Sequence, residues 1–440
     1  MKTPIVAIIG LPNTGKSTLF NKILEERKAL TYPVAGTTRD RAYGLTSWNG
    51  FSFYLVDTAG IINNPNSDLE KNVQKQTAIA KQEADLILLL VDGQTPASSE
   101  DLRIASTITQ SKTPAILAVN KIDVRNNKTE TAAAAYLKLG LGQPHLVSSV
   151  NGSGIGDLLD ALVIQLTERY PAETKDEEKG LRVAFVGKPN VGKSSLINAL
   201  LKQERVLVHH EAGTTRSTVE IPFEHHGTKF ILLDTAGIKK KWKQDTDVEA
   251  AAAFQAIRTT SLADVIFFTI DGSAEITAQD QIVAAQILEA QKSAVIVLNK
   301  IDLIDEQRQN HLLDILPDYF PQMWYFPVLF SSSKTGQGLD LLLKFAQEAA
   351  SAAERELDQG ELDNFLEKML AENMPGKMED QRAPKIYNLK QLGVKPPTFK
   401  MTVNFPAAVA TAWKKFFEKQ FRMKFGFEGT PIQIKYIKRI

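Results

Sequence analysis

The stretch Gly10-Leu-Pro-Asn-Thr-Gly-Lys-Ser17 decides how this chain folds. It follows an apolar run at residues 5–9 and precedes apolar residues at helical spacing, beginning with Leu19 and Phe20. That order predicts a strand, a phosphate-binding loop and the start of a helix. Glycines let backbone N–H groups converge on phosphate oxygens there, Lys16 can reach the β- and γ-phosphates, and the Ser17 hydroxyl can ligate Mg²⁺.

The same pattern returns at Gly187-Lys-Pro-Asn-Val-Gly-Lys-Ser194, 177 residues further on. Three other pairs of runs repeat at offsets of 177, 179 and 184 residues: Asp57-Thr-Ala-Gly-Ile61 with Asp234-Thr-Ala-Gly-Ile238, Asn120-Lys-Ile-Asp123 with Asn299-Lys-Ile-Asp302, and Ser148-Ser149 with Ser332-Ser333. A repeat of this length is a duplicated domain, because a solenoid repeat takes only about 20 to 50 residues.

Each copy alternates short apolar runs with amphipathic segments, which predicts an α/β fold with a mainly parallel sheet flanked by helices. Asn49-Gly50 and Gly227 predict a hairpin and one antiparallel edge strand in each copy. The motifs then fall at the carboxyl edge of each sheet, where open α/β folds bind ligands. The expected strands are 5–9, 42–48, 51–57, 86–91, 114–119 and 145–147, then 182–186, 218–225, 229–234, 264–270, 293–298 and 325–330.

We expect a first domain at residues 1–170, a second at 181–356 and a third, smaller domain at 357–440. Residues 171–180 are polar and acid-rich and form the expected linker. The third domain has an αββαβ-like pattern, with a helix around 362–370, extended runs at 384–389 and 398–404, a helix at 407–425 and a strand at 431–437.

The composition excludes several classes of protein. The 440 residues include no cysteine, so the chain has no disulfide, thiolate metal site or cysteine nucleophile, which fits a reducing compartment. The apolar runs are shorter than the ~20 residues of a membrane-spanning helix, and residues 1–9 enter the first strand without room for a cleavable signal. We expect a cytoplasmic protein with no membrane partner.

The Asn-Lys-Ile-Asp runs predict which base is bound. The carboxylates of Asp123 and Asp302 can accept hydrogen bonds from guanine N1–H and its 2-amino group. Adenine lacks both donors and would leave a buried carboxylate unpaired. Because these runs follow a phosphate loop and an Asp-x-x-Gly run in both copies, we expect both copies to bind guanine nucleotides.

The ends of two strands and the loops after the first helix of each copy supply candidates for binding Mg²⁺ and the γ-phosphate. Asp57 and Asp234 would hold Mg²⁺ directly or through water, and the N–H groups of Gly60 and Gly237 would face the γ-phosphate. The expected switch threonines, which complete Mg²⁺ coordination when the γ-phosphate is present, are Thr38 and Thr215, with Thr37 and Thr214 as alternatives that spacing does not separate.

Ile61 and Ile238 follow Asp-x-x-Gly, where Ras-like GTPases carry a glutamine that orients the attacking water. An isoleucine can neither accept a proton nor hold this water. Catalysis then requires another positive charge, from a partner's arginine or from a monovalent cation. Asn13 and Asn190 can coordinate such a cation through their side-chain carbonyls or can simply pin their loops by hydrogen bonds, and the residues leave both readings open.

The third domain is basic: residues 376–440 contain 14 Lys and Arg and four Asp and Glu. A net charge of +10 predicts binding to nucleic acid. Gly426-Phe-Glu-Gly429 matches the G-x-x-G of RNA-clamping loops, but it lies between the last helix and the last strand and carries Glu428, so we do not assign it that role. The aromatic residues of 413–425 recur at helical spacing and are expected in the core, so we expect recognition of the RNA backbone.

Together these features resemble the bacterial double Era-like GTPases, the Der (EngA) family among the TrmE-Era-EngA-like GTPases. The resemblance also covers Thr37-Thr-Arg-Asp-Arg41, Gly213-Thr-Thr-Arg216, Lys395-Pro-Pro-Thr-Phe399 and Gly426-Phe-Glu-Gly-Thr-Pro-Ile432. It implies a KH-like third domain and GTP hydrolysis coupled to late assembly of the large (50S) ribosomal subunit. The implied partners are this subunit and its rRNA, and we expect a monomer away from the ribosome.

The resemblance further implies potassium-stimulated hydrolysis, because the two isoleucines match the hydrophobic residue that replaces glutamine in this family. It thereby favours the cation-binding reading of Asn13 and Asn190. The chain departs from the family at Leu11 and Thr14, which stand where Arg and Val are usual. Ser149 and Ser333 replace an alanine whose backbone contacts guanine O6, and backbone donation survives that change.

The expected site residues follow from these motifs. Those expected to bind nucleotide in the first copy are Gly10, Leu11, Pro12, Asn13, Thr14, Gly15, Lys16, Ser17, Asp57, Thr58, Ala59, Gly60, Ile61, Asn120, Lys121, Ile122, Asp123, Ser148 and Ser149. Those in the second copy are Gly187, Lys188, Pro189, Asn190, Val191, Gly192, Lys193, Ser194, Asp234, Thr235, Ala236, Gly237, Ile238, Asn299, Lys300, Ile301, Asp302, Ser332 and Ser333. The expected Mg²⁺ ligands are Ser17, Thr38, Asp57, Ser194, Thr215 and Asp234. The expected catalytic residues are Asn13, Lys16, Thr38, Gly60, Asn190, Lys193, Thr215 and Gly237.

Three hypotheses compete. In the first, both copies hydrolyse GTP and their switch loops control docking of the basic domain. In the second, one copy holds nucleotide permanently and the chain is an rRNA-binding scaffold. The third is a tRNA-modifying GTPase, which would share the Thr-Thr-Arg-Asp switch but carry a C-terminal reactive cysteine that this chain lacks. Intact motifs in both copies favour the first.

Overall fold

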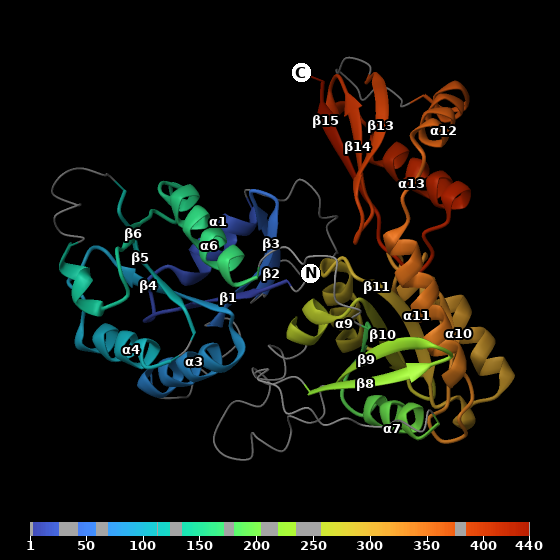
Figure 1. Cartoon of the computed structure of the whole chain (residues 1–440), viewed down its shortest axis with the longest axis horizontal. Coiled ribbons are helices and arrows are strands. Elements are labelled where there is room, and N and C mark those ends of the chain that lie inside the picture. The colour runs from blue at the N-terminus through green and yellow to red at the C-terminus, as the bar shows by residue number, and fades with distance from the viewer. Residues whose placement is uncertain are drawn as a thin grey trace. The chain divides into compact units, whose positions relative to one another are not determined.

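The computed structural model describes residues 3–25, 43–58, 69–111, 113–123, 134–170, 180–203, 219–234, 257–374 and 384–439. Its chain forms two compact units (Figure 1). The described residues of the first unit fall within 3–170, Val219 and 257–262, and those of the second fall within 180–203, 220–234 and 263–439. In these described stretches, no helix is both long and apolar enough to cross a membrane.

Six strands form the sheet of the first unit, in the order β2-β3-β1-β4-β5-β6. All neighbouring strands are parallel except β2 and β3, which confirms the hairpin at Asn49-Gly50. The strands are β1 (Ile5–Ile9), β2 (Tyr43–Trp48), β3 (Phe51–Asp57), β4 (Leu86–Asp92), β5 (Ala115–Asn120) and β6 (His145–Leu146). The helices are α1 (Lys16–Glu25), α3 (Leu69–Glu83), α4 (Ser99–Thr109), the short 3₁₀ helix η1 (Ala135–Leu139) and α6 (Ile155–Arg169).

The second unit begins with a sheet of the same topology, in the order β8-β9-β7-β10-β11-β12. Its strands are β7 (Leu181–Val186), β8 (Val219–His225), β9 (Thr228–Asp234), β10 (Val265–Asp271), β11 (Ser293–Asn299) and β12 (Val328–Phe330), and its helices are α7 (Lys193–Gln203), α9 (Ala278–Glu289), η3 (Ile301–Leu303), α10 (Glu306–Tyr319) and α11 (Leu339–Glu354). The prediction of a strand from residue 325 is wrong by three residues, because Trp324 and Tyr325 form a turn and Pro327 has no N–H to donate.

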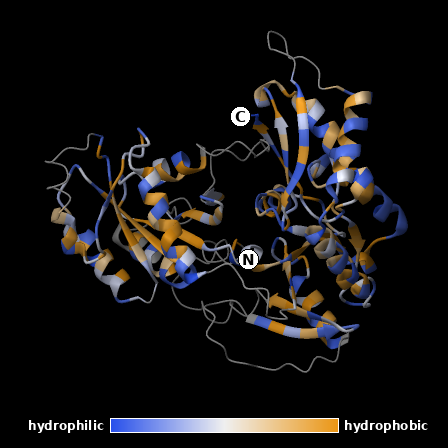
Figure 2. Cartoon of the chain, turned by 45° about the horizontal axis from the view of Figure 1, so that its top comes forward, coloured by the Kyte–Doolittle hydropathy of each residue, from blue (hydrophilic) through white to orange (hydrophobic). Residues whose placement is uncertain are grey.

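Both sheets are buried on both faces, as parallel sheets flanked by helices require. All five residues of β1 are buried, and β4 is buried up to Asp92. Helices α1 and α6 cover one face, where Leu19 and Leu158 pack with Val6 and Leu88 (Figure 1). The central strands of the first sheet accordingly stand out as hydrophobic (Figure 2), and burial of each such side chain contributes about 1.5–3 kcal/mol.

The third domain follows α11 and has the predicted αββαβ order. Its elements are α12 (Gln359–Glu372), β13 (Ile386–Gly393), β14 (Thr398–Val403), the 3₁₀ turn η4 (Pro406–Ala408), α13 (Thr411–Phe425) and β15 (Gln433–Lys438). Strand β14 pairs antiparallel with β13 and parallel with β15. The helix predicted from residue 407 begins only at Thr411, because Val409 and Ala410 have extended backbones after the η4 turn.

The aromatic residues of α13 form the core of this domain, which confirms their predicted role. Trp413, Phe417, Phe421 and Phe425 are buried, and each ring lies within about 6 Å of the next, centroid to centroid. They pack against the apolar face of the three-stranded sheet. The opposite face of that sheet carries its polar side chains.

The loop between α13 and β15 attaches the third domain to the second repeat. The Gly429 N–H donates to the Tyr325 carbonyl and its carbonyl accepts from Ala294 N–H, both at 2.8 Å. The Arg422 guanidinium stacks on the Tyr325 ring at 3.8 Å and donates to the Thr430 carbonyl at 2.9 Å. Gly426–Gly429 is therefore a packing element rather than a free clamp loop, in line with the sequence analysis.

Candidate nucleotide-binding sites and nucleic-acid interface

The first phosphate loop joins β1 to α1, and its own backbone holds its lysine. Lys16 Nζ donates to the carbonyls of Gly10 at 3.0 Å and Leu11 at 2.7 Å. Burial lowers the pKa of Lys16 to about 8, against the opposing effect of the Asp57 carboxylate. A phosphate group that displaces these carbonyls would give the buried ammonium a better partner, so the loop is suited to bind an anion.

The loop is also connected to the end of β3, because Ser17 Oγ donates to Asp57 Oδ2 at 2.5 Å. A hydroxyl and a carboxylate oxygen side by side are the hard ligands that Mg²⁺ prefers, so this pair fits the predicted metal site. Ser194 and Asp234 lie at the corresponding ends of α7 and β9, and the side chain of Asp234 lies outside the described part of the chain.

Asn120 ties the phosphate loop to the base-reading run. Its Nδ2 donates to the Thr14 carbonyl at 2.8 Å, and its Oδ1 accepts from Ser149 N–H at 2.9 Å and from Ser149 Oγ at 2.7 Å. A Cβ on Gly15, whose φ is +92°, would lie 2.3 Å from Asn120 Nδ2. Glycine at this position is therefore needed for the approach of the asparagine as well as for the turn.

The second copy has the same arrangement. Asn299 Nδ2 donates to the Val191 carbonyl at 2.9 Å, and Asn299 Oδ1 accepts from Ser333 N–H at 3.3 Å. A Cβ on Gly192, at φ +98°, would lie 2.2 Å from Asn299 Nδ2. Two regions more than 100 residues apart in sequence thus meet in each copy.

The carboxylates predicted to read guanine are each oriented by a serine. Ser148 Oγ donates to Asp123 Oδ1, and Ser332 Oγ donates to Asp302 Oδ1, both at 2.7 Å. The structure thus brings each aspartate together with the serine pair predicted to lie near the base. A carboxylate fixed in this way suits a base with adjacent N–H donors.

Sequence analysis missed two aspartates that fix the lysines of the base-reading runs. Lys121 Nζ lies 2.6 Å from Asp92 Oδ2, and Lys300 Nζ lies 2.6 Å from Asp271 Oδ2. Burial acts to raise the pKa of Asp271, but hydrogen bonds from Lys300 and Ser273 outweigh it and lower this pKa. The sequence does contain a signal for these aspartates, since each ends a strand and precedes a glycine, and the two pairs repeat at the 179-residue offset.

Several predicted residues lie outside the described part of the chain. They are Thr37, Thr38, Ala59, Gly60, Ile61, Thr214, Thr215, Thr235, Ala236, Gly237 and Ile238. Asn13 and Asn190 are described: both are exposed and have left-handed backbones, with φ of 63° and 67°. Asparagine tolerates this conformation, and in both copies it presents the side chain at the loop surface.

A family model described as "50S ribosome-binding GTPase" matches residues 5–121 and 182–300. A second model, "KH-domain-like of EngA bacterial GTPase enzymes, C-terminal", matches residues 357–436. The GTPase Der of Moorella thermoacetica is 40% identical over 436 residues, covering 99% of this chain and 98% of that protein. This chain belongs to the Der family of GTPases. Its nucleotides are accordingly GTP and GDP, and its reaction is GTP hydrolysis.

A second curated relative is consistent with membership of the Der family. The GTPase Der of Chloroflexus aggregans is 36% identical over 449 residues, covering 100% of this chain and 99% of that protein. Among solved structures, the G domain of FeoB from Methanococcus jannaschii aligns with 38% of this chain and 99% of its own length, at 24% identity and a TM-score of 0.28.

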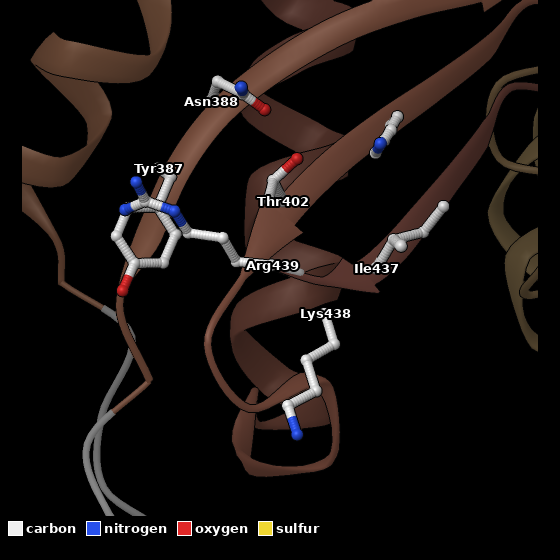
Figure 3. Close-up of a pocket in the computed structure, with 7 residues that line it drawn as sticks. Tyr387, Asn388, Thr402, Ile437, Lys438 and Arg439 are labelled. Atoms are coloured by element: carbon white, nitrogen blue, oxygen red, sulfur yellow. The ribbon is translucent and has the colours of Figure 1, made fainter.

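The open face of the three-stranded sheet in this Der-family chain carries a hollow of about 510 Å³ (Figure 3). Its lining residues are Tyr387, Asn388, Lys400, Thr402, Ile437, Lys438 and Arg439. The Arg439 guanidinium lies 4.5 Å from the centroid of the Tyr387 ring. The hollow is therefore lined by three cations, two hydroxyls, one aromatic ring, the Asn388 amide and the Ile437 side chain.

Strand register places three lysines in one row across this face. Lys400 on β14 is the partner of Lys390 on β13 and of Lys435 on β15. The three strands contain no acidic residue. None of the three lysines has an ion-pair partner among the residues that the structure describes. Like charges opposite one another destabilise a sheet, so an anionic partner would relieve this row.

Proposed function

We propose that this GTPase is an assembly factor acting in late steps of large (50S) ribosomal subunit biogenesis in the cytoplasm. In this proposal the nucleotide state of two G domains, at residues 1–170 and 181–356, controls docking on rRNA of the KH-like domain at 357–440. Residues 171–180 are the linker, and the chain is a monomer away from the ribosome. The lysine row on the open sheet face carries the proposal, and the description of the matching family model supports it.

Each G domain would bind GTP with the same parts. Lys16 and Lys193 would donate to the phosphates after leaving the loop carbonyls that they now contact. Asp123 and Asp302 would accept from guanine, and the backbone N–H groups of Gly60 and Gly237 would face the γ-phosphate. The Mg²⁺ ligands would be Ser17, Thr38 and Asp57 in the first domain and Ser194, Thr215 and Asp234 in the second. Mg²⁺, when bound, would neutralise charge on the phosphates.

We assign the missing catalytic charge to potassium held by Asn13 and Asn190, since Ile61 and Ile238 replace the water-orienting glutamine. The assignment is supported by the two asparagines themselves, because each is exposed and has a left-handed backbone in its loop. Replacing KCl by NaCl should slow GTP hydrolysis severalfold, and Asn13→Ala should remove the difference in the first domain. Equal rates in the two salts would refute the assignment.

The rRNA proposal is tested with the full-length protein and purified 50S subunits. Lys390→Ala, Lys400→Ala and Lys435→Ala together remove the row without exposing the core. If three phosphate contacts are lost, cosedimentation should weaken and the slope of log affinity against log salt should fall in magnitude by about 2 to 3. The measurement is made with a non-hydrolysable GTP analogue and with GDP, because the proposal requires the two states to differ.

A matched control removes three exposed lysines from the helical face of the same domain, namely Lys368, Lys415 and Lys419. This triple variant has the same net charge as the first but keeps the row. We expect it to bind 50S subunits like the unmodified chain. Equal loss of binding in both variants would mean that net charge, rather than the sheet face, attracts the subunit.

A further inference from the structure

The second phosphate loop is anchored to a neighbouring helix by a buried ion pair. Lys188 Nζ lies 2.7 Å from Asp280 Oδ2, and the exposed fractions of the two side chains are 15% and 0%. The same lysine lies 3.3 Å from Thr277 Oγ1. Asp280 Oδ2 also accepts from Thr277 N–H at 2.9 Å and from its hydroxyl at 2.8 Å, so this carboxylate is fixed at the start of α9.

Lys188 also contacts Lys193, the lysine expected to bind phosphate. The carbonyl of Lys188 accepts from Lys193 Nζ at 2.7 Å. The side chain of Lys188 thus fixes the same residue whose backbone positions Lys193. Restricting that residue reduces the conformational entropy that the loop loses when nucleotide binds.

The first loop has the same acceptor but not the cation. Asp101 corresponds to Asp280 at the 179-residue offset, is 6% exposed, and its Oδ2 accepts from Ser98 N–H at 2.9 Å and from the Ser98 hydroxyl at 2.8 Å. Leu11 stands where the second loop has Lys188, although its carbonyl still accepts from Lys16 Nζ at 2.7 Å. Among the described residues, the Asp101 carboxylate has no ion-pair partner, whereas Asp280 has Lys188. In both carboxylates Oδ1 accepts no hydrogen bond, so the lysine is the difference between the two sites.

We propose that the Lys188–Asp280 pair makes the second G domain the slow-release nucleotide site and that Leu11 leaves the first as the fast-exchanging one. Two effects act in the same direction. The pair pre-organises the second loop, and it neutralises a buried carboxylate that would otherwise repel phosphate. In the first domain the Leu11 carbonyl accepts from Thr14 Oγ1 at 2.9 Å and from Lys16 Nζ at 2.7 Å, but the Leu11 side chain cannot pair with α4. The charge of Asp101 therefore stays uncompensated.

Each site can be followed separately in the full-length chain. Asp123→Asn removes the guanine-reading carboxylate of the first domain, so fluorescent GDP then measures release from the second domain alone. Asp302→Asn removes the carboxylate of the second domain, so the same probe measures release from the first. In these backgrounds we expect GDP to leave the second domain about ten times more slowly than the first. Lys188→Leu should raise the release rate of the second domain about tenfold, whereas Lys188→Arg, which keeps a cation beside Asp280, should retain slow release.

The reciprocal change, Leu11→Lys, gives the first domain the missing partner for Asp101 and should slow its GDP release severalfold. This gain cannot come from damage to the fold. Unchanged release in Leu11→Lys, or equal rates for Lys188→Arg and Lys188→Leu, would overturn the proposal. A Lys188→Leu chain that unfolds at lower temperature but releases GDP at the original rate would reduce the pair to a structural contact. None of these measurements involves the ribosome, so a negative result would leave the proposed assembly function untouched.

Discussion

At the scale of single residues, the first nucleotide site depends on a lysine buried before any phosphate arrives. Lys16 is 6% exposed, and burial lowers its pKa to about 8. A bound phosphate stabilises the ammonium form and raises this pKa. Between pH 8 and that higher value, binding therefore takes up a proton, and affinity falls as pH rises.

We predict that GDP affinity at the first site falls above pH 8, by up to about tenfold per pH unit. Fluorescent GDP titrations of the Asp302→Asn chain between pH 7 and 9.5 measure this. The Asp123→Asn chain gives the second site for comparison, where Lys193 contacts the carbonyls of Gly187 and Lys188 in the same way. A GDP affinity at the first site that stays constant between pH 8 and 9.5 would contradict the titration of Lys16.

At the scale of elements, each phosphate loop and each base-reading loop form one connected unit. Asn120, at the end of β5, reaches the loop before α1 because Gly15 has no side chain. Strand order brings these ends together, since β4 lies between β1 and β5 and all three are parallel. Phosphate and base recognition are therefore coupled through one asparagine.

We predict that Gly15→Ala weakens GDP binding at the first site at least tenfold, because the new methyl group would displace Asn120. Gly50→Ala is the matched control: its φ is +81°, but nothing lies within 4 Å of an added Cβ. It should cost about 1 kcal/mol of stability from backbone strain and leave GDP affinity unchanged. Equal affinities in the two variants would show that the contact with Asn120 is dispensable.

At the scale of the molecule, the second repeat and the third domain form one compact unit. The third domain contacts Ser293 and Ala294 at the amino end of β11, whereas Asn299 serves the nucleotide site at the carboxyl end. The two ends are about 20 Å apart along the strand. In the proposed coupling, the second nucleotide therefore cannot act on the third domain by direct contact between Asn299 and these attachment residues.

The attachment depends on Arg422, which is buried and touches both parts. Its guanidinium donates to the Phe427 carbonyl at 2.8 Å and stacks on Tyr325. We predict that Arg422→Ala lowers the free energy of unfolding by about 3 kcal/mol, because two buried carbonyls lose a charged donor. Urea denaturation measures this loss.

The control for that measurement is Lys419→Ala, an exposed change on the same helix, which should stay within about 0.5 kcal/mol of the unmodified chain. GDP release from the first G domain should be unaffected by either change. An Arg422→Ala chain as stable as this control would show that the attachment does not depend on the arginine. Because the third domain is packed in this way, point variants test the proposed role of its lysine row more cleanly than deletion of residues 357–440.

The amino-acid sequence determined the repeat, the α/β fold class, both phosphate loops and the preference for guanine. These features depend on local chemistry: glycines that admit a loop conformation, apolar periodicity that selects strand or helix, and motif residues at fixed spacing. Strand ends were predicted to within two residues, except that β12 begins three residues late, after Pro327, and β13 runs four residues beyond the predicted 389. The η4 turn delays the start of helix α13 by four residues. The net positive charge of the third domain could also be counted from the sequence.

Only the tertiary structure decided which distant residues meet. The row of Lys390, Lys400 and Lys435 arises from strand register, which no local spacing encodes. The partners of Lys188 and Gly429 lie 92 and more than 100 residues away, and they are fixed by sheet order and domain packing. Sequence motifs determine which ligand a loop can bind, because the atoms of the motif contact the ligand. Contacts between elements determine how tightly the loop binds that ligand, and these contacts depend on the fold of the whole chain.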